Sequence, residues 1–132
     1  MEKLKKNLIF ILGGTLEIGI DCVDISRFDK NIISKKNLLR KIFTEKEIQY
    51  CEKKNRKSQH YAVRFAGKEA VVKAFSNYKI KISLNKIEIL NKKNRAPYVK
   101  ILDDKISNFI IKISLSHSDN TAFAVVIIYK KD

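Results

Sequence analysis

Residues 59–75 carry the longest helical pattern in the chain, and they constrain the fold more than any other segment does. The run QHYAVRFAGKEAVVKAF is rich in alanine and phenylalanine, and its charges are few. A helix this apolar must bury much of its surface against other parts of the protein. We therefore expect a long helix that the rest of the chain covers on several sides.

Strand patterns lie on both sides of this helix in the sequence. Before it, Glu17–Ile25 alternates loosely between apolar and polar residues, which indicates a strand. After it, strands are predicted over Lys81–Leu90 (with a possible bulge), Tyr98–Leu102, Ile111–Ser116 and Ala122–Tyr129. The last two strands are joined by the short turn at residues 118–121 and so form a hairpin.

Two shorter helices are predicted between the first strand and the long helix. Ser26 can cap a helix that begins near Arg27. Thr44-Glu45-Lys46-Glu47 has the spacing of a capping box, so a second helix starts there and runs to about Lys54. One strand, then helices, then several strands predict an α+β fold in which an antiparallel sheet packs on the long buried helix. The 132 residues suit a single domain over residues 15–132, preceded by an N-terminal extension over residues 1–14.

The composition limits the class of partner and the compartment. The chain has 28 Lys and Arg against 14 Asp and Glu, and the net charge of +14 attracts polyanions. One hypothesis is therefore a basic nucleic-acid-binding domain, but the aromatic residues do not cluster with Lys or Arg, and scattered solvated lysines explain most of the charge. Cys22 and Cys51 lack metal-like spacing and fit a reducing cytoplasm, and Cys22 is expected to be buried. No apolar run reaches the roughly 20 residues that span a membrane.

A few polar residues lie in apolar surroundings and are candidates for chemistry. Glu69 and Lys73 are four residues apart and share one helix face, and this spacing alone favours an ordinary helix salt bridge. Asp21 lies inside an apolar strand, whereas Asp24 points to the opposite face, so the two do not form a carboxylate pair. His117 lies between two serines at a strand end, where it suits a general base, a phosphate ligand or a turn residue.

Three segments together resemble the motifs of one enzyme family. They are IGIDCVDISRF at Ile18–Phe28, RFAGKEAVVKAF at Arg64–Phe75, and ISLSHS at Ile113–Ser118 followed by TAFAVV. Their order and separation are similar to those of the holo-acyl-carrier-protein synthases, which are short bacterial-type 4′-phosphopantetheinyl transferases. Two loops differ from the family pattern. Ser76-Asn77-Tyr78 replaces the usual Gly-Thr-Gly, and Arg95-Ala96-Pro97 replaces the usual Gly-Lys-Pro.

The resemblance implies a 4′-phosphopantetheinyl transferase fold and a reaction that depends on Mg²⁺. The family transfers 4′-phosphopantetheine from coenzyme A to a serine of apo-acyl carrier protein, for fatty acid biosynthesis, and releases adenosine 3′,5′-bisphosphate. Asp21 and Glu69 match the family's Mg²⁺ ligands, and Mg²⁺ prefers one or two carboxylates together with waters and phosphate oxygens. Glu69 is the expected acceptor of the serine proton. Lys73 is expected to contact the diphosphate.

The resemblance also implies binding residues and an assembly. The expected coenzyme A ligands are His117 and Ser118 for the diphosphate, and Arg56 and Lys57 for the 3′-phosphate. Arg27 matches the arginine that docks the acidic carrier protein, and Lys41 assists it. The short bacterial type is a homotrimer with active sites between subunits, and we expect the same here, in the cytoplasm. A further hypothesis is an inactive trimeric binding module, because the two altered loops depart from the family pattern.

Overall fold

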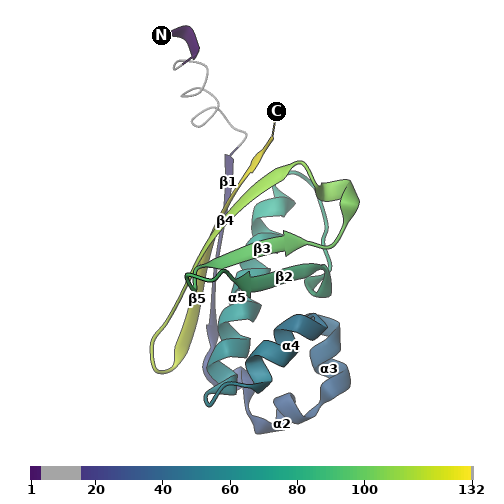
Figure 1. The fold of residues 1–132 in the computed structure, drawn as a ribbon, viewed down its shortest axis with the longest axis vertical. Coiled ribbons are helices and arrows are strands. Elements are labelled where there is room, and N and C mark those ends of the chain that lie inside the picture. Colours follow the sequence, from purple (N-terminus) through teal and green to yellow (C-terminus); the bar gives the residue numbers. More distant parts are fainter. Residues whose placement is uncertain (4–15, 132) are drawn as a thin grey trace.

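The computed structural model describes residues 1–3 and 16–131, and the expected boundary between residues 14 and 15 lies outside this part of the chain. The described residues adopt the α+β fold that the sequence predicts (Figure 1). Helix α5 (Lys57–Ser76) runs through the middle of the molecule, and it contains the long apolar pattern that predicted it. Elements from both halves of the chain pack against α5.

Two antiparallel sheets flank α5. The larger sheet has the strand order β1-β5-β4, so that β5 (Thr121–Lys130) lies between the edge strands β1 (Leu16–Asp24) and β4 (Phe109–His117). The smaller sheet pairs β2 (Ile87–Asn91) with β3 (Pro97–Ile101). Helix α5 covers β1 and β5 and also touches β2. The predicted C-terminal hairpin is confirmed as β4 and β5.

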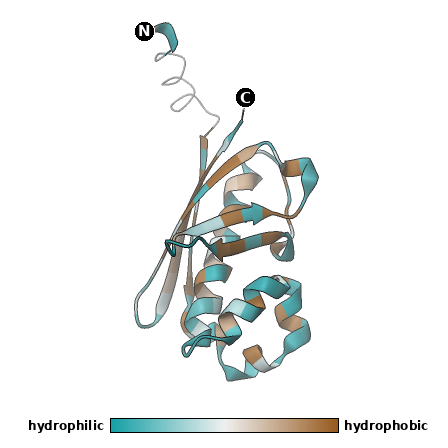
Figure 2. Cartoon of the chain, in the orientation of Figure 1, coloured by the Kyte–Doolittle hydropathy of each residue, from teal (hydrophilic) through white to brown (hydrophobic). Residues whose placement is uncertain are grey.

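Three short helices gather beside the N-terminal half of α5 (Figure 1). They are α2 (Lys30–Ser34), α3 (Lys36–Ile42) and α4 (Glu45–Glu52). Helix α4 begins with the predicted capping box, because Thr44 Oγ1 accepts a hydrogen bond from the Glu47 backbone and Glu47 Oε1 accepts one from the Thr44 backbone. In Figure 2 hydrophobic colouring runs along β2 and β4, whereas α4 is coloured mostly as hydrophilic. None of the helices in the described part of the chain has the length and apolarity needed to cross a membrane.

The prediction of a helix that starts near Arg27 is wrong. Residues Ile25–Phe28 form a 3₁₀ turn (η1), and α2 begins only at Lys30, where the Asp29 side chain accepts a hydrogen bond from the Ile32 backbone at 3.0 Å. Phe28 explains the difference, because its ring is buried against the rings of Phe43 and Phe65 at centroid distances of 5.8 and 5.4 Å. The chain turns inward to bury this ring before the helix starts.

The strand predicted over Lys81–Leu90 is only partly present. Residues Leu84–Lys86 form a 3₁₀ turn (η2), and the strand begins at Ile87. The buried ammonium group of Lys68 donates hydrogen bonds to the carbonyl groups of Leu84 and Ile87, so the backbone turns towards this lysine. The alternating apolar residues before Ile87 therefore pack on the core without forming a ladder.

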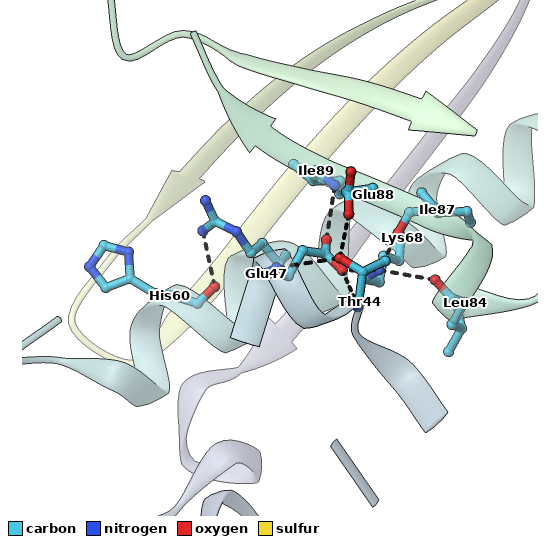
Figure 3. A network of polar contacts seen from close by, with 9 residues as sticks. Thr44, Glu47, His60, Lys68, Leu84, Ile87, Glu88 and Ile89 are labelled. Atoms are coloured by element: carbon cyan, nitrogen blue, oxygen red, sulfur yellow. Dashed lines mark hydrogen bonds and ion pairs between the residues drawn. The ribbon is translucent and has the colours of Figure 1, made fainter. Parts of the chain in front are cut away.

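A buried polar network joins α4, α5 and β2 (Figure 3). Lys68 Nζ lies 2.6 Å from Glu47 Oε1, and both side chains are fully buried. The other carboxylate oxygen of Glu47 accepts a hydrogen bond from the Ile89 backbone, and Thr44 donates one to Glu88. Burial lowers the pKa of Lys68, while the Glu47 carboxylate opposes this shift. Removing either member of the pair leaves an uncompensated buried charge, which costs about 3–5 kcal/mol.

The face of the larger sheet that points away from α5 is apolar along β1 and β5. Along β1, Gly19 and Val23 point towards α5, whereas Ile18 and Ile20 point outward and are 58% and 65% exposed. Cys22 lies on the same outward face and is exposed, so the expectation that it is buried is wrong. The strand alternation that buries Val23 places Cys22 on the other face.

Candidate active site

Gly19 allows strand β1 to lie directly against helix α5. A Cβ atom at this position would lie 1.9 Å from the backbone oxygen of Ala70 and 3.0 Å from the backbone nitrogen of Ala74. Both helix residues are alanines, so small side chains on the two elements permit the contact. Because of this approach, the residue two positions further along β1, Asp21, lies beside α5.

Asp21 and Lys73 meet at this contact. Lys73 Nζ lies 3.0 Å from Asp21 Oδ1, and it also donates a hydrogen bond to the backbone carbonyl of Ile20 at 3.0 Å. The Asp21 side chain is 17% exposed and that of Lys73 is 54% exposed. An ion pair this open contributes little to stability, about 0–1 kcal/mol. The pair therefore holds two chemically useful groups within reach of solvent.

Glu69 lies one helical turn before Lys73 on the same side of α5. Its carboxylate is half-buried and makes no hydrogen bond or ion pair with any residue that the structure describes. The ordinary helix salt bridge favoured by the spacing is therefore absent here, since Lys73 pairs with Asp21 instead. Arg27 is on this side too, with its guanidinium 5.1 Å from the ring centre of Phe65, which precedes Glu69 by one turn.

A cavity of about 320 Å³ lies on another side of α5, next to the end of β4. His117 lines it, and His117 Nε2 lies 3.0 Å from the side-chain nitrogen of Gln59 in α5. The other ring nitrogen lies 3.3 Å from the Ser118 carbonyl oxygen, which can only accept. In this arrangement Nδ1 donates to the Ser118 carbonyl, and Nε2 faces the Gln59 amide.

Ser118 has a structural role in the hairpin turn. Its Oγ accepts a hydrogen bond from the Thr121 backbone at 3.2 Å, and its own backbone donates to the Thr121 carbonyl at 2.8 Å. The side chain is exposed at the end of the hairpin, beside His117. The turn therefore fixes the position of His117 relative to α5.

Arg64 is the residue of this cavity that sequence reasoning missed. Its side chain is buried, and its guanidinium lies 4.0 Å from the ring centre of Tyr50. Its Nε has no hydrogen-bond partner in the described part of the chain, and its contacts to the His60 carbonyl and to Asn91 are 3.4 Å long. A charged residue inside an otherwise apolar helix was the available signal. The sequence does not show that β2 and β4 lie beside Arg64, and so it does not place Arg64 in this cavity.

His60 brings the second histidine of the chain to the same cavity. Burial lowers the pKa of His60, and the positive charges of Arg64 and Lys54 lower it further. The imidazole is therefore neutral at pH 7. Arg64 and Arg95, which both line this cavity, carry permanent positive charge here.

Arg56 and Lys57 lie away from His117. They line a separate cavity of about 520 Å³ between α2 and the start of α5. Lys57 Nζ lies 3.5 Å from Glu52 Oε1, and Lys36 lies 2.9 Å from the same oxygen. Lys41 is exposed near the end of α3. The structure thus gathers Asp21, Glu69, Lys73 and Arg27 on one side of α5 and places the other expected ligands elsewhere.

The expected diphosphate ligands Lys73 and His117 lie apart within one chain. His117 contacts Gln59 at the start of α5, whereas Lys73 lies fourteen residues further along the helix, about 21 Å at 1.5 Å per residue. Asp21 and His117 lie on opposite edge strands of the larger sheet, with β5 between them. The edge strands β1 and β4 are two strand spacings apart, which is about 9.5 Å.

The acidic groups suit one class of metal. No group of three or more His, Cys, Asp or Glu side chains in the described residues is arranged as a complete metal site. Asp21 and Glu69 offer two carboxylates near solvent, which fits Mg²⁺, since this ion keeps several waters and takes substrate phosphate oxygens. A zinc-like site closed by four protein ligands does not fit these residues.

Comparison with known proteins identifies the class. Residues 17–126 match the model of the 4′-phosphopantetheinyl transferase superfamily. The chain therefore belongs to this superfamily, and the match includes the segments that carry Asp21, Glu69, Lys73 and His117. This membership replaces the hypothesis of a basic nucleic-acid-binding domain.

Individual relatives narrow the class to one family. The chain is 40% identical over 118 residues to the holo-[acyl-carrier-protein] synthase of Fusobacterium nucleatum, with 84% of this chain and 96% of that protein covered. It is 37% identical over 122 residues to the enzyme of the same name from Geotalea daltonii, with 85% and 96% covered. Within the superfamily, the chain belongs to the holo-[acyl-carrier-protein] synthases.

Solved structures agree with this assignment. The holo-(acyl-carrier-protein) synthase of Bacillus anthracis, in complex with CoA (3′,5′-ADP), superimposes with a TM-score of 0.72 at 28% identity, covering 87% of this chain and 96% of that one. The synthase of Helicobacter pylori, in complex with coenzyme A, gives a TM-score of 0.68 at 30% identity, covering 84% and 98%. The expected 4′-phosphopantetheinyl transferase fold is confirmed.

Proposed function

We propose that this protein is an Mg²⁺-dependent transferase that moves 4′-phosphopantetheine from coenzyme A to a serine of apo-acyl carrier protein, for fatty acid biosynthesis in the cytoplasm. The observation that carries the proposal is the contact of Lys73 with Asp21 at 3.0 Å, one helical turn from the carboxylate of Glu69, which pairs with no described residue. The family membership and the coenzyme A complexes of the relatives support the substrate. The two unpaired cysteines fit a reducing compartment.

The reaction forms one phosphorus–oxygen bond and breaks another. The serine Oγ of the carrier protein attacks the β-phosphorus of coenzyme A, and the bond from that phosphorus to the oxygen bridging to the α-phosphate breaks. Adenosine 3′,5′-bisphosphate leaves with the bridging oxygen. The serine proton passes to the Glu69 carboxylate, which has no competing partner among the described residues.

Lys73 and Asp21 position and stabilise the phosphates. The Lys73 ammonium is held at one edge of α5 by Asp21 and by the Ile20 carbonyl, so it is oriented before substrate binds. It offers a positive charge to the departing phosphate. Asp21 and Glu69 would hold Mg²⁺, which neutralises diphosphate charge and the charge that develops during transfer.

The complete site is proposed to form between chains of a homotrimer. His117 contacts Gln59 at the start of α5, whereas Lys73 lies near the end of that helix, and the separation of the two supports a site in which a neighbouring chain supplies one of them. The outward face of the larger sheet offers an apolar surface for this association. Its exposed residues include Ile18, Ile20, Phe123 and Ile127. Such a patch marks a protein contact surface.

The carrier protein is proposed to dock beside Glu69. Arg27 is exposed on that side of α5, with its guanidinium against Phe65, and Lys41 adds charge near the end of α3. A net charge of +14 speeds encounter with an acidic partner, and added salt slows it. His117 and Ser118 are proposed to serve the diphosphate, and Arg56 and Lys57 the 3′-phosphate.

The direct test is the intact mass of an apo-acyl carrier protein after incubation with this protein, coenzyme A and Mg²⁺. We expect the carrier to gain one phosphopantetheine group and adenosine 3′,5′-bisphosphate to appear in equal amount. A carrier in which alanine replaces the acceptor serine is the matched control and should gain nothing. An unchanged carrier mass with folded protein would contradict the proposal and favour the inactive binding module.

A further inference from the structure

The cavity beside His117 holds positive charge that its protein partners do not neutralise. Arg64 is buried there without an ion pair to any described carboxylate, its Nε lacks a partner, and its contacts to oxygen are 3.4 Å long. A buried cation is unfavourable unless an anion or strong hydrogen-bond acceptors meet it. The cavity, at about 320 Å³, lies within the size range of ligand pockets. It therefore suits an anionic group of a ligand.

Arg95 lines the same cavity and has an unfavourable backbone conformation. Its φ is 69°, in the left-handed region that glycine adopts freely and other residues rarely adopt. The turn between β2 and β3 requires this conformation. The Arg95 backbone donates to the Lys92 carbonyl, and the Lys92 backbone donates to the Ala96 carbonyl, each at 2.9 Å. Glycine is the residue that such hairpin turns prefer at this position.

The Arg95 side chain has no role in holding the turn. Its guanidinium makes no hydrogen bond or ion pair with any residue in the described part of the chain, and the residue is exposed. Residues in such sparsely populated conformations are enriched at functional sites. A guanidinium presents a planar fork of donors that matches the oxygens of a phosphate.

We propose that Arg95 is a specificity-determining residue that binds a phosphate group of the adenosine 3′,5′-bisphosphate half of coenzyme A in this cavity. The inference rests on the proposed function, because it takes coenzyme A as the substrate. It adds a residue where the family pattern has glycine. Arg95 and Arg64 together then face the phosphate, one from the turn and one from α5.

The test compares two single substitutions in the same turn. Arg95→Gly removes the guanidinium and restores the preferred backbone residue, whereas Lys93→Gln removes one positive charge from a residue that does not line the cavity. Binding of coenzyme A to the full chain is measured by calorimetry, together with the midpoint of thermal unfolding. For Arg95→Gly we expect about tenfold weaker binding with an unchanged or higher midpoint. For Lys93→Gln we expect less than about a twofold change in affinity.

Dephospho-coenzyme A, which lacks the 3′-phosphate, identifies the phosphate. If Arg95→Gly weakens binding of coenzyme A but not of dephospho-coenzyme A, Arg95 binds the 3′-phosphate. If it weakens binding of coenzyme A and of dephospho-coenzyme A equally, Arg95 binds the diphosphate. Either result supports the inference. Unchanged affinity of Arg95→Gly for both ligands would overturn it while leaving the proposed function intact. Failure of the unmodified protein to bind coenzyme A would overturn both.

Discussion

Asp21, Glu69 and Lys73 are held in three different ways at the contact of β1 with α5. Asp21 accepts from Lys73, Lys73 also donates to a backbone carbonyl, and Glu69 has no partner among the described residues. The sequence could predict these three because they stand in two specific motifs. It could not predict Arg64, His60 or Arg95 as one group, because α5, the β2–β3 turn and the end of β4 bring them together only in the fold.

The free carboxylate gives a prediction at the residue scale. Glu69→Gln should remain folded, since it breaks no ion pair that the structure shows, but transfer should fall by at least about 100-fold because the serine proton loses its acceptor. The rate is measured by the mass gain of the carrier protein and folding by circular dichroism. Glu45→Gln, which alters an exposed glutamate on α4, is the control. A near-normal rate in Glu69→Gln would remove Glu69 from the mechanism.

At the scale of elements, side-chain periodicity and capping patterns predicted most of the fold. Strand β1, the capping box of α4, the long helix α5 and the C-terminal hairpin all follow local patterns that the structure confirms. The errors arose where distant groups decide local structure. Burial of Phe28 delays α2, and Lys68 turns the chain before β2. The local sequence shows neither the rings that bury Phe28 nor the contact of Lys68 with the chain before β2.

Gly19 gives a prediction for the contact between two elements. Gly19→Ala should destabilise the protein by about 1–3 kcal/mol and reduce transfer, because the new Cβ meets a backbone oxygen that cannot rotate away. Gly67→Ala is the comparison, since its Cβ meets the flexible end of Ile89 at 2.6 Å and alanine favours a helix. Urea unfolding measures both variants. Equal losses at the two positions would show that the approach of β1 to α5 is not specially tight.

Glu52 gives a prediction for pH dependence, since it links α3, α4 and α5. Burial alone would raise the pKa of Glu52, but hydrogen bonds from Lys36 and Tyr61 with the charge of Lys57 lower it below the ordinary 4.5. A lowered carboxyl pKa contributes stability above about pH 4.5 that is lost as pH falls through the folded value. Glu52→Gln should therefore be less stable at neutral pH and lose less on acidification. Urea unfolding at about pH 7 and about pH 3 measures this. Parallel pH profiles for the two proteins would refute it.

At the scale of the whole molecule, we propose that association of chains explains two features. One is the exposed apolar surface of β1 and β5, and the other is the separation of Lys73 from His117. In the described part of the chain the apolar outward face of β1 and β5 is exposed, and the proposed diphosphate ligands Lys73 and His117 lie apart along α5. Alternation along β1 indicated one buried face, but the sequence could not show that the other face is apolar across neighbouring strands. We propose that association of chains covers this face and completes the site.

Ile20 tests this association. Ile20 is 65% exposed, so Ile20→Asp should leave the folded chain stable but convert the oligomer to monomer and abolish transfer. Light scattering after gel filtration measures the mass, and Lys46→Asp on the exposed surface of α4, away from the larger sheet, is the comparison for added negative charge. If Ile20→Asp keeps the mass and activity of the unmodified protein, this face is not the contact surface.

The central claim is that transfer takes place where Lys73 of one chain meets His117 of a neighbouring chain. Lys73→Ala and His117→Ala proteins, each inactive alone, are unfolded together, refolded as a mixture, and assayed by the mass gain of the carrier protein. Random assembly from equal amounts should restore about a quarter of the sites, because each intact site needs one unaltered residue from each of two chains. A mixture that stays inactive, although mass spectrometry shows mixed oligomers, would contradict the account.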